Sequence, residues 1–125
     1  MTVQDLVTLT LTAINAVQAG ETPNSDDSNL MLSLFNGLIG SWNAALRKSM
    51  AATYDPSLYT FEPVAQFTKL DLVIILPDGW QRALQWNGAL DATIPFGRPI
   101  PDGLVQLAAQ SKAEIITPQN TGPTS

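Results

Sequence analysis

The sequence predicts a mainly α-helical protein: a small four-helix bundle with an extended loop or short β-hairpin between helices two and three, and an extended C-terminal tail. Apolar residues recur at intervals of three and four over most of the 125-residue chain. The runs are bounded by capping residues, glycines and prolines. A chain of this length forms one domain that buries roughly two thirds of its unfolded surface. We therefore assign residues 1–116 to one helical domain and residues 117–125 to the tail.

A first helix is predicted over residues 2–19. Thr2 is its expected N-cap, and Asp5 follows three residues later in a capping-box arrangement. Gly20 stands where a left-handed C-cap is expected. Leu9 and Leu11 lie off the buried face. That face carries Val3, Leu6, Val7, Thr10, Ile14 and Val17.

A long second helix is predicted from residue 25 to about residue 52, with Ser25 as the N-cap and Asp26 and Asp27 in the first turn. Pro56 ends it, because the residue before a proline avoids helical conformations. The expected apolar stripe is Met31, Leu34, Phe35, Leu38, Trp42, Ala45 and Leu46.

Two glycines, Gly37 and Gly40, lie inside this second helix. Each destabilises a helix by about 1 kcal/mol relative to alanine. We interpret both as positions of close packing against another helix. That helix belongs either to this chain, which we favour, or to a neighbouring subunit.

The remaining elements follow from strand and proline signals. Residues 58–61 and 72–76 are strand-like. A third helix with Pro77 near its first position is predicted to end near Gly97, and its buried face includes Ile94. A fourth helix starts after Pro101, and we attribute the two Pro-Asp-Gly sequences to a shared way of starting a helix rather than to duplication. Its expected face is Leu104, Ala108, Ser111 and Ile115.

Two asparagines stand among apolar residues of the predicted helices, at Asn36 and Asn87. A buried asparagine must be hydrogen-bonded. We therefore predict that each one holds a loop or fixes the register between two helices.

The composition excludes several kinds of chemistry. The chain has no cysteine and no histidine, which excludes disulfides, thiolate sites and histidine-dependent catalysis. We expect no enzyme activity, no cofactor and no metal. A net charge of −5 disfavours binding to nucleic acid. Only 14% of residues are charged, against about 25% in typical domains. The surface is therefore either covered by other chains or built from uncharged polar residues. We expect neither a signal peptide nor a membrane span.

A set of short motifs runs through the chain. In the first half they are Gly20-Glu21-Thr22-Pro23, Asp26-Asp27, Leu34-Phe35-Asn36 and Ser41-Trp42. In the second half they are Leu76-Pro77-Asp78-Gly79-Trp80, Ala83-Leu84, Trp86-Asn87, Ala89, Gly97-Arg98-Pro99-Ile100-Pro101, Leu104, Ala108 and Lys112. Over about residues 2–116 the chain resembles bacteriophage head-to-tail adaptor proteins, also called head-completion, tail accessory or packaged-DNA stabilisation proteins. It departs from their pattern at Gly88, where the family usually has leucine, and over residues 93–96.

The resemblance implies a structural virion protein at the head–tail junction, assembled in the host cytoplasm. About twelve copies of such an adaptor form a closed ring. The ring docks beneath the portal protein, continues the DNA channel and helps to retain the packaged DNA, which passes through without sequence-specific binding. It also presents a surface to the tail nozzle or tail-tube proteins. The resemblance further implies that the C-terminal segment reaches the portal, which makes the candidate docking residues Thr117, Pro118, Gln119, Asn120 and Thr121.

Two alternatives remain open on the sequence. One is a non-viral helical module that binds a single protein partner. The other, which we rank below it, is a peptidoglycan hydrolase that works with a pair of carboxylates. Such an enzyme needs two facing acids. Asp26 and Asp27 are adjacent and point about 100° apart on a helix, so they do not form such a pair.

Overall fold

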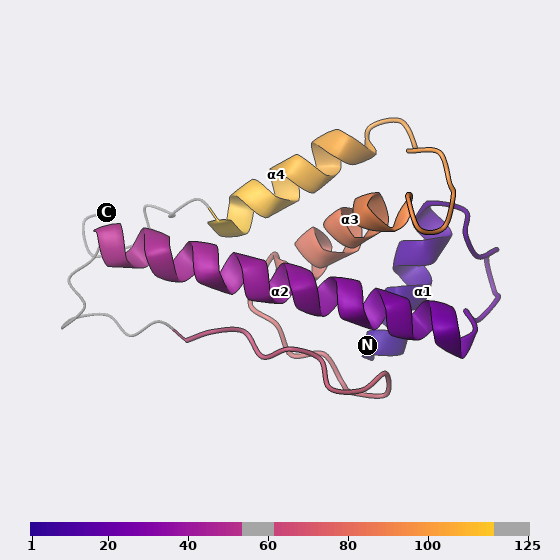
Figure 1. Ribbon diagram of the computed structural model, residues 1–125, viewed down its shortest axis with the longest axis horizontal. Coiled ribbons are helices and arrows are strands. Elements are labelled where there is room, and N and C mark those ends of the chain that lie inside the picture. Colours follow the sequence, from indigo (N-terminus) through magenta and orange to yellow (C-terminus); the bar gives the residue numbers. More distant parts are fainter. Residues whose placement is uncertain (54–61, 117–125) are drawn as a thin grey trace.

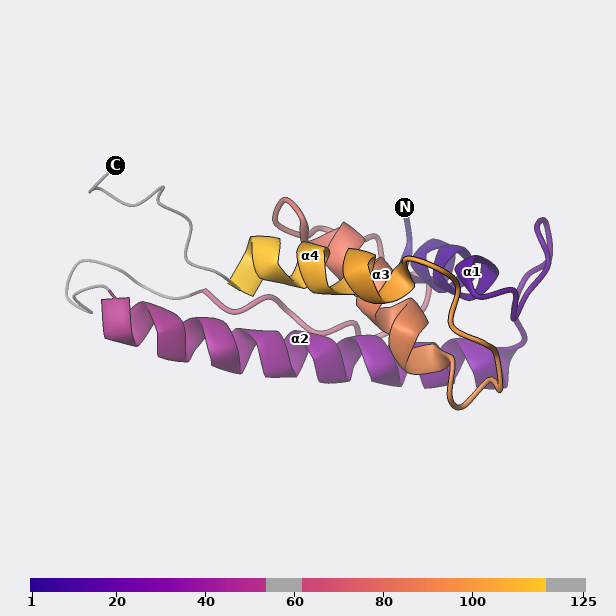
Figure 2. The ribbon, with the colours of Figure 1, turned by 90° about the horizontal axis from the view of Figure 1, so that it is seen from above.

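Four helices make up the described part of the protein (Figure 1). The computed structural model describes residues 1–53 and 62–116. Within these ranges the chain is mainly helical and has no β-strand, which confirms the predicted small helical bundle. The helices are α1 (Val3–Ala13), α2 (Ser25–Thr53), α3 (Trp80–Ala92) and α4 (Leu104–Ile116). Helix α3 contacts the other three. Figure 2 shows α2 along one side of the molecule and α1, α3 and α4 along the other.

Helix α1 begins as predicted and ends earlier. The hydroxyl of Thr2 accepts a hydrogen bond from the Asp5 backbone N–H at 3.2 Å, and the Asp5 carboxylate accepts one from the Thr2 N–H at 2.9 Å. The helix ends at Ala13 instead of residue 19, because Asn15 takes a left-handed conformation with φ of 60°. The predicted face is buried, and so is Leu11, which we had placed outside it. Leu11 is covered because α1 contacts both α2 and α3.

The capping box makes the stability of the protein depend on pH. The hydrogen bond from the Thr2 N–H lowers the pKa of Asp5 below its usual value, and the Thr2 hydroxyl and the amino terminus act in the same direction. A carboxyl with a lowered folded-state pKa stabilises the fold above its unfolded pKa, and this contribution disappears as the pH falls through the folded value. We expect Asp5→Asn to lower the urea midpoint at neutral pH and to match the unmutated chain in strong acid. An equal difference at both pH values would contradict this assignment.

Helix α2 begins at Ser25, but its cap lies one residue earlier than predicted. The side-chain carbonyl of Asn24 accepts a hydrogen bond from the Asp27 N–H at 2.8 Å. Ala45 is exposed instead of buried, and Ile39 is fully buried in the stripe. Both views show the C-terminal end of α2 extending past the end of α4 (Figures 1 and 2). Leu46, near that end of the predicted stripe, still packs against the core.

Aromatic contacts fill the centre of the bundle. The ring of Trp42 on α2 meets that of Trp80 edge to face, with centroids 5.7 Å apart. Phe35 lies two turns earlier on the same face of α2. Its ring meets that of Phe67, in the following loop, edge to face with centroids 6.2 Å apart. Edge-to-face pairs of this kind stabilise a fold by about 0.5 to 1.5 kcal/mol beyond their buried area.

Helices α3 and α4 start from the same type of turn. The N–H of Trp80 donates to the carbonyl of Pro77 at 3.2 Å, and the N–H of Leu104 donates to that of Pro101 at 3.1 Å. Gly79 and Gly103 take the left-handed conformation at the third position of these turns, with φ of 84° and 82°. Each proline therefore stands three residues before its helix, and our placement of Pro77 near the first helical position was wrong.

The end of α3 also differs from the prediction. The helix ends at Ala92 instead of near Gly97, because Pro95 lacks the N–H that would continue it. Ile94, which we had placed on the buried face, is 87% exposed on the turn that follows.

Asn87 ties α3 to α4. Its side-chain amide donates to the Ala83 carbonyl on its own helix and to the Ala108 carbonyl on α4, both at 2.9 Å. This confirms the predicted role of Asn87 in helix register. The predicted face of α4 is also confirmed: Leu104, Ala108 and Ser111 are buried, and Ile115 packs against the core.

Candidate interaction surfaces

The loop after α2 returns along that helix as an extended segment held by two asparagines. Asn36 forms a pair of hydrogen bonds with the backbone of Phe67, one to its carbonyl at 2.9 Å and one from its N–H at 2.7 Å. Asn43 does the same with Val64, at 2.8 and 3.0 Å. Seven helical residues span about 10.5 Å and three extended residues about 10 Å, so the two spacings match. The predicted loop-holding role of Asn36 is confirmed. Asn43 was not predicted.

Residues 72–76 continue this connection without forming the strand that we predicted. Val73 makes one isolated antiparallel bridge with Thr2, flanked by a hydrogen bond from the Val3 N–H to the Leu72 carbonyl at 2.9 Å. The pairing stops there because α1 begins at Val3 and offers no further extended backbone. The described part of the connection, residues 62–79, is therefore an extended loop and not a hairpin. The other strand-like run, residues 58–61, lies outside the described residues.

The outward face of α2 carries no charge. Between Asp27 and Arg47 the helix has no charged residue. Charged side chains normally occupy the solvent face of a helix. The exposed residues on this face, which we call the α2 outer face, are Asn29, Leu30, Ser33, Gly37, Ser41 and Ala44.

The two glycines of α2 are not sites of helix packing within the described chain. A Cβ atom at Gly37 would meet no atom within 4 Å, and one at Gly40 would meet the side chain of Gln66 in the loop at 3.4 Å. The favoured interpretation, packing against a helix of the same chain, was therefore wrong. Packing against a neighbouring subunit stays a prediction. The close approach lies at Gly88 on α3, where a Cβ would stand 2.5 Å from the ring of Phe35.

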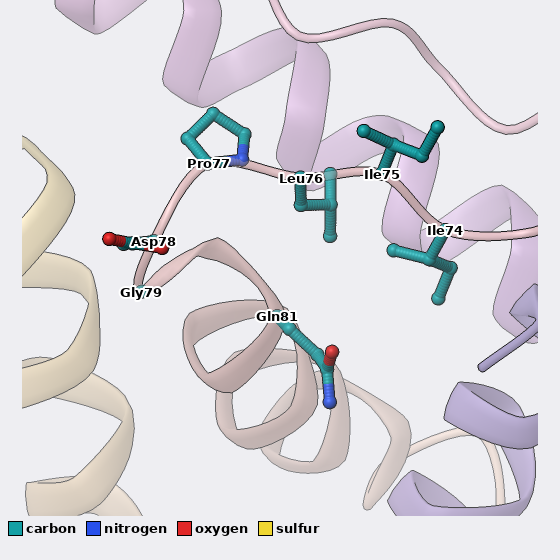
Figure 3. Close-up of a pocket in the computed structure, with 7 residues that line it drawn as sticks. All are labelled: Ile74, Ile75, Leu76, Pro77, Asp78, Gly79 and Gln81. Atoms are coloured by element: carbon teal, nitrogen blue, oxygen red, sulfur yellow. The ribbon is translucent and has the colours of Figure 1, made fainter.

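A pocket of about 350 Å³ lies between residues 74–79 and the first turn of α3. Figure 3 shows the side chains of Ile74 and Leu76 pointing toward Gln81 on α3, with Asp78 at one end of the space. On the same segment Val73 is 63% exposed and Ile75 is 90% exposed. A second, shallower hollow of about 490 Å³ lies between the first half of α1 and the turn at Gly20.

Two carboxyl groups in residues 1–53 and 62–116 have a shifted pKa, Asp5 in the capping box and Asp91 on α3. No cluster of three or more metal-binding side chains occurs there. Burial raises the pKa of Asp91, and Lys112 opposes that shift. The ion pair between Lys69 and Asp71, at 3.9 Å, is exposed at the surface.

The candidate portal-docking residues Thr117 to Thr121 lie outside the described residues. In the part of the chain that is described, no helix combines the length and hydropathy that crossing a bilayer requires. The chain matches no protein-family model, and comparisons with curated proteins and with solved structures give no significant match.

Proposed function

We propose that this chain is a non-enzymatic virion protein, a head-to-tail adaptor that assembles as a ring of about twelve copies beneath a bacteriophage portal. In that position it continues the DNA channel, helps to retain packaged DNA and offers a surface to the tail. The observation that carries the proposal is the uncharged outer face of α2. An exposed helix face without charge is suited to cover by another chain. On this face a Cβ at Gly37 would meet no atom of the described residues within 4 Å.

The motifs behind the resemblance give a second line of support. They include several residues that make tertiary contacts. Asn36 holds the loop at Phe67, Trp42 meets Trp80, and Asn87 joins α3 to α4. Part of the pattern therefore falls on positions that support a shared fold, since each of these three contacts bridges two elements that lie far apart in the sequence.

Native mass spectrometry of the chain, mixed with the portal ring from the same source, tests the proposal. We expect a discrete increase in mass of about twelve copies. Gly37→Gln is expected to reduce this association, because it places a long side chain on the α2 outer face. Ala113→Gln, at an exposed position of α4, serves as the matched control. A folded chain that stays monomeric beside the portal would instead favour a helical module with a single protein partner.

Deletion of residues 117–125 tests the candidate docking residues separately. We expect the shortened chain to keep its helical circular dichroism spectrum, because the four described helices end at Ile116. We expect its attachment to the portal to weaken. Unchanged portal binding by a chain that remains helical would remove Thr117 to Thr121 from the docking surface.

A further inference from the structure

We propose that copies of this chain associate head to tail, through contact between a turn at one end of α3 and a pocket at its other end. The first surface is the Ile94 turn, residues 93–98. The second is the α3-start pocket, lined by residues 74–79 and Gln81. The inference rests on the proposed function in one respect, because it names the contact between copies that a ring requires.

The Ile94 turn presents an aliphatic side chain from a fixed backbone. Ile94 is 87% exposed. The Gly97 N–H donates to the Ile94 carbonyl at 3.1 Å, and the Arg98 N–H donates to the Thr93 carbonyl at 2.9 Å. These bonds hold the turn closed, so little conformational entropy is lost when Ile94 is buried by a partner. Arg98 is exposed beside it.

The α3-start pocket is an open hollow with room for that side chain, and its lining is partly polar and partly aliphatic. A cavity of about 150 Å³ already accommodates a benzene-sized molecule, and this pocket measures about 350 Å³. Ile74 and Leu76 supply aliphatic surface, and Gln81 forms the opposite wall (Figure 3). Asp78 lines one end.

Charge favours contact between unlike surfaces over contact between like ones. Two pockets facing each other bring their Asp78 carboxylates together, and two Ile94 turns bring their Arg98 side chains together. An Ile94 turn in a pocket sets Arg98 near Asp78. Neither of these two groups has an ion-pair partner among residues 1–53 and 62–116.

Because the two surfaces lie on different parts of the molecule, each copy can make the same contact with a copy on either side. They lie at opposite ends of α3, a helix of 13 residues that spans about 20 Å. In Figure 1 the two ends of α3 point to opposite sides of the molecule. A contact between two different surfaces leaves one of each free, so further copies add until the assembly closes.

Disulfide trapping tests the contact, since the natural chain has no cysteine. We expect the double variant Gln81→Cys with Ile94→Cys to give, on oxidation, a reducible ladder of dimers, trimers and larger species. The two cysteines of one chain are too far apart to bond to each other. The matched control pairs Gln81→Cys with Ala113→Cys, and it should remain monomeric. Circular dichroism checks that every variant is folded.

Charge reversal refines the test. Asp78→Lys should lower the ladder yield of the double-cysteine variant about fivefold, and adding Arg98→Asp should restore it, as for an interfacial pair coupled by about 1 kcal/mol. A ladder no stronger than that of the control overturns the head-to-tail contact. Covalent dimers from either single-cysteine variant, at the yield of the double variant, overturn it in favour of like-with-like pairing.

The outcomes separate this inference from the proposed function. If the double-cysteine variant forms the ladder but the chain does not bind the portal, the head-to-tail contact is supported and the adaptor function is contradicted. If about twelve copies bind the portal but the double-cysteine variant forms no ladder, the adaptor function is supported and the head-to-tail contact is contradicted.

Discussion

Asn36→Ala is expected to lower the free energy of unfolding by about 2 to 4 kcal/mol. The substitution removes both hydrogen bonds to Phe67, at 2.7 and 2.9 Å, and leaves that residue's N–H and carbonyl unpaired. Phe67 is only 5% exposed, so water replaces these bonds poorly. Its ring contact with Phe35 depends on the same anchoring. Urea denaturation followed by tryptophan fluorescence measures the loss.

Asn29→Ala is the matched control for this prediction. Asn29 lies seven residues before Asn36 on the same helix and is exposed. The loop leaves α2 before reaching it, through a turn near Leu70, so we expect a change within about 0.5 kcal/mol. Asn36→Asp keeps the acceptor for the Phe67 N–H and loses the donor to its carbonyl. It should cost nearly as much as alanine. Equal stability of the Asn36 and Asn29 variants would contradict the anchoring role.

Gly88→Ala is expected to destabilise the protein by about 1 to 3 kcal/mol, although alanine is the better helix former. The new Cβ would stand 2.5 Å from Cε1 and 3.2 Å from Cδ1 of Phe35. Phe35 is fully buried, so its ring has no free space to move into. The two helices must therefore separate or the ring must leave its rotamer. Thermal unfolding measures the effect.

Gly37→Ala and a double variant serve as controls for this prediction. A Cβ at Gly37 meets nothing within 4 Å, so in the isolated chain this change should stabilise α2 by about 0.5 to 1 kcal/mol. Phe35→Leu removes the ring edge that the Gly88 Cβ would meet. The double variant Gly88→Ala with Phe35→Leu should therefore cost less than the sum of the two single changes. Strict additivity would show that the contact does not limit the approach of α2 and α3.

Local signals predicted the starts of the elements better than their ends. The capping box of Thr2 and Asp5 forms as expected, because both partners lie within one turn of sequence. The end of α1 was misplaced by six residues. The spacing of Ile14 and Val17 suits a helix, but both are buried from the irregular segment that follows Ala13. Burial alone does not distinguish these two cases.

The sequence predicted a long-range contact only where a residue type requires a hydrogen-bond partner when it is buried. Asn36 and Asn87 had to be hydrogen-bonded once they lay among apolar residues, and both are. Asn43 carries a usable signal, its spacing of seven residues from Asn36 on one face of the helix. The apolar run 72–76 alternates as a strand does, with Val73 and Ile75 outward. A strand also needs a partner of equal length, and nothing local in the sequence shows that this partner ends at Thr2.

The candidate surfaces were harder to predict than the fold. The glycines of α2 indicated close packing, but the sequence does not show which face of the helix the loop would cover. Ile94 was assigned to the core because its spacing continues that of α3, and Pro95 places it on the outside instead. The α3-start pocket lies between residues 74–79 and the first turn of α3, which are connected by the left-handed turn at Gly79. Hydrophobic periodicity contains no signal for such a pocket.

Helix α1 depends on contacts with later parts of the chain, and this determines when the protein can fold during its synthesis. The N–H groups of Val3 and Gln4 donate to the carbonyls of Leu72 and Leu70, and α1 packs against α3, which ends at Ala92. On the ribosome, α1 and most of α2 emerge well before these partners exist. A nascent chain that stalls before Trp80 leaves the apolar faces of both helices open to other chains. We therefore expect the fold to be completed only after α3 has been made, and truncated translation products to be substrates for chaperones or proteases.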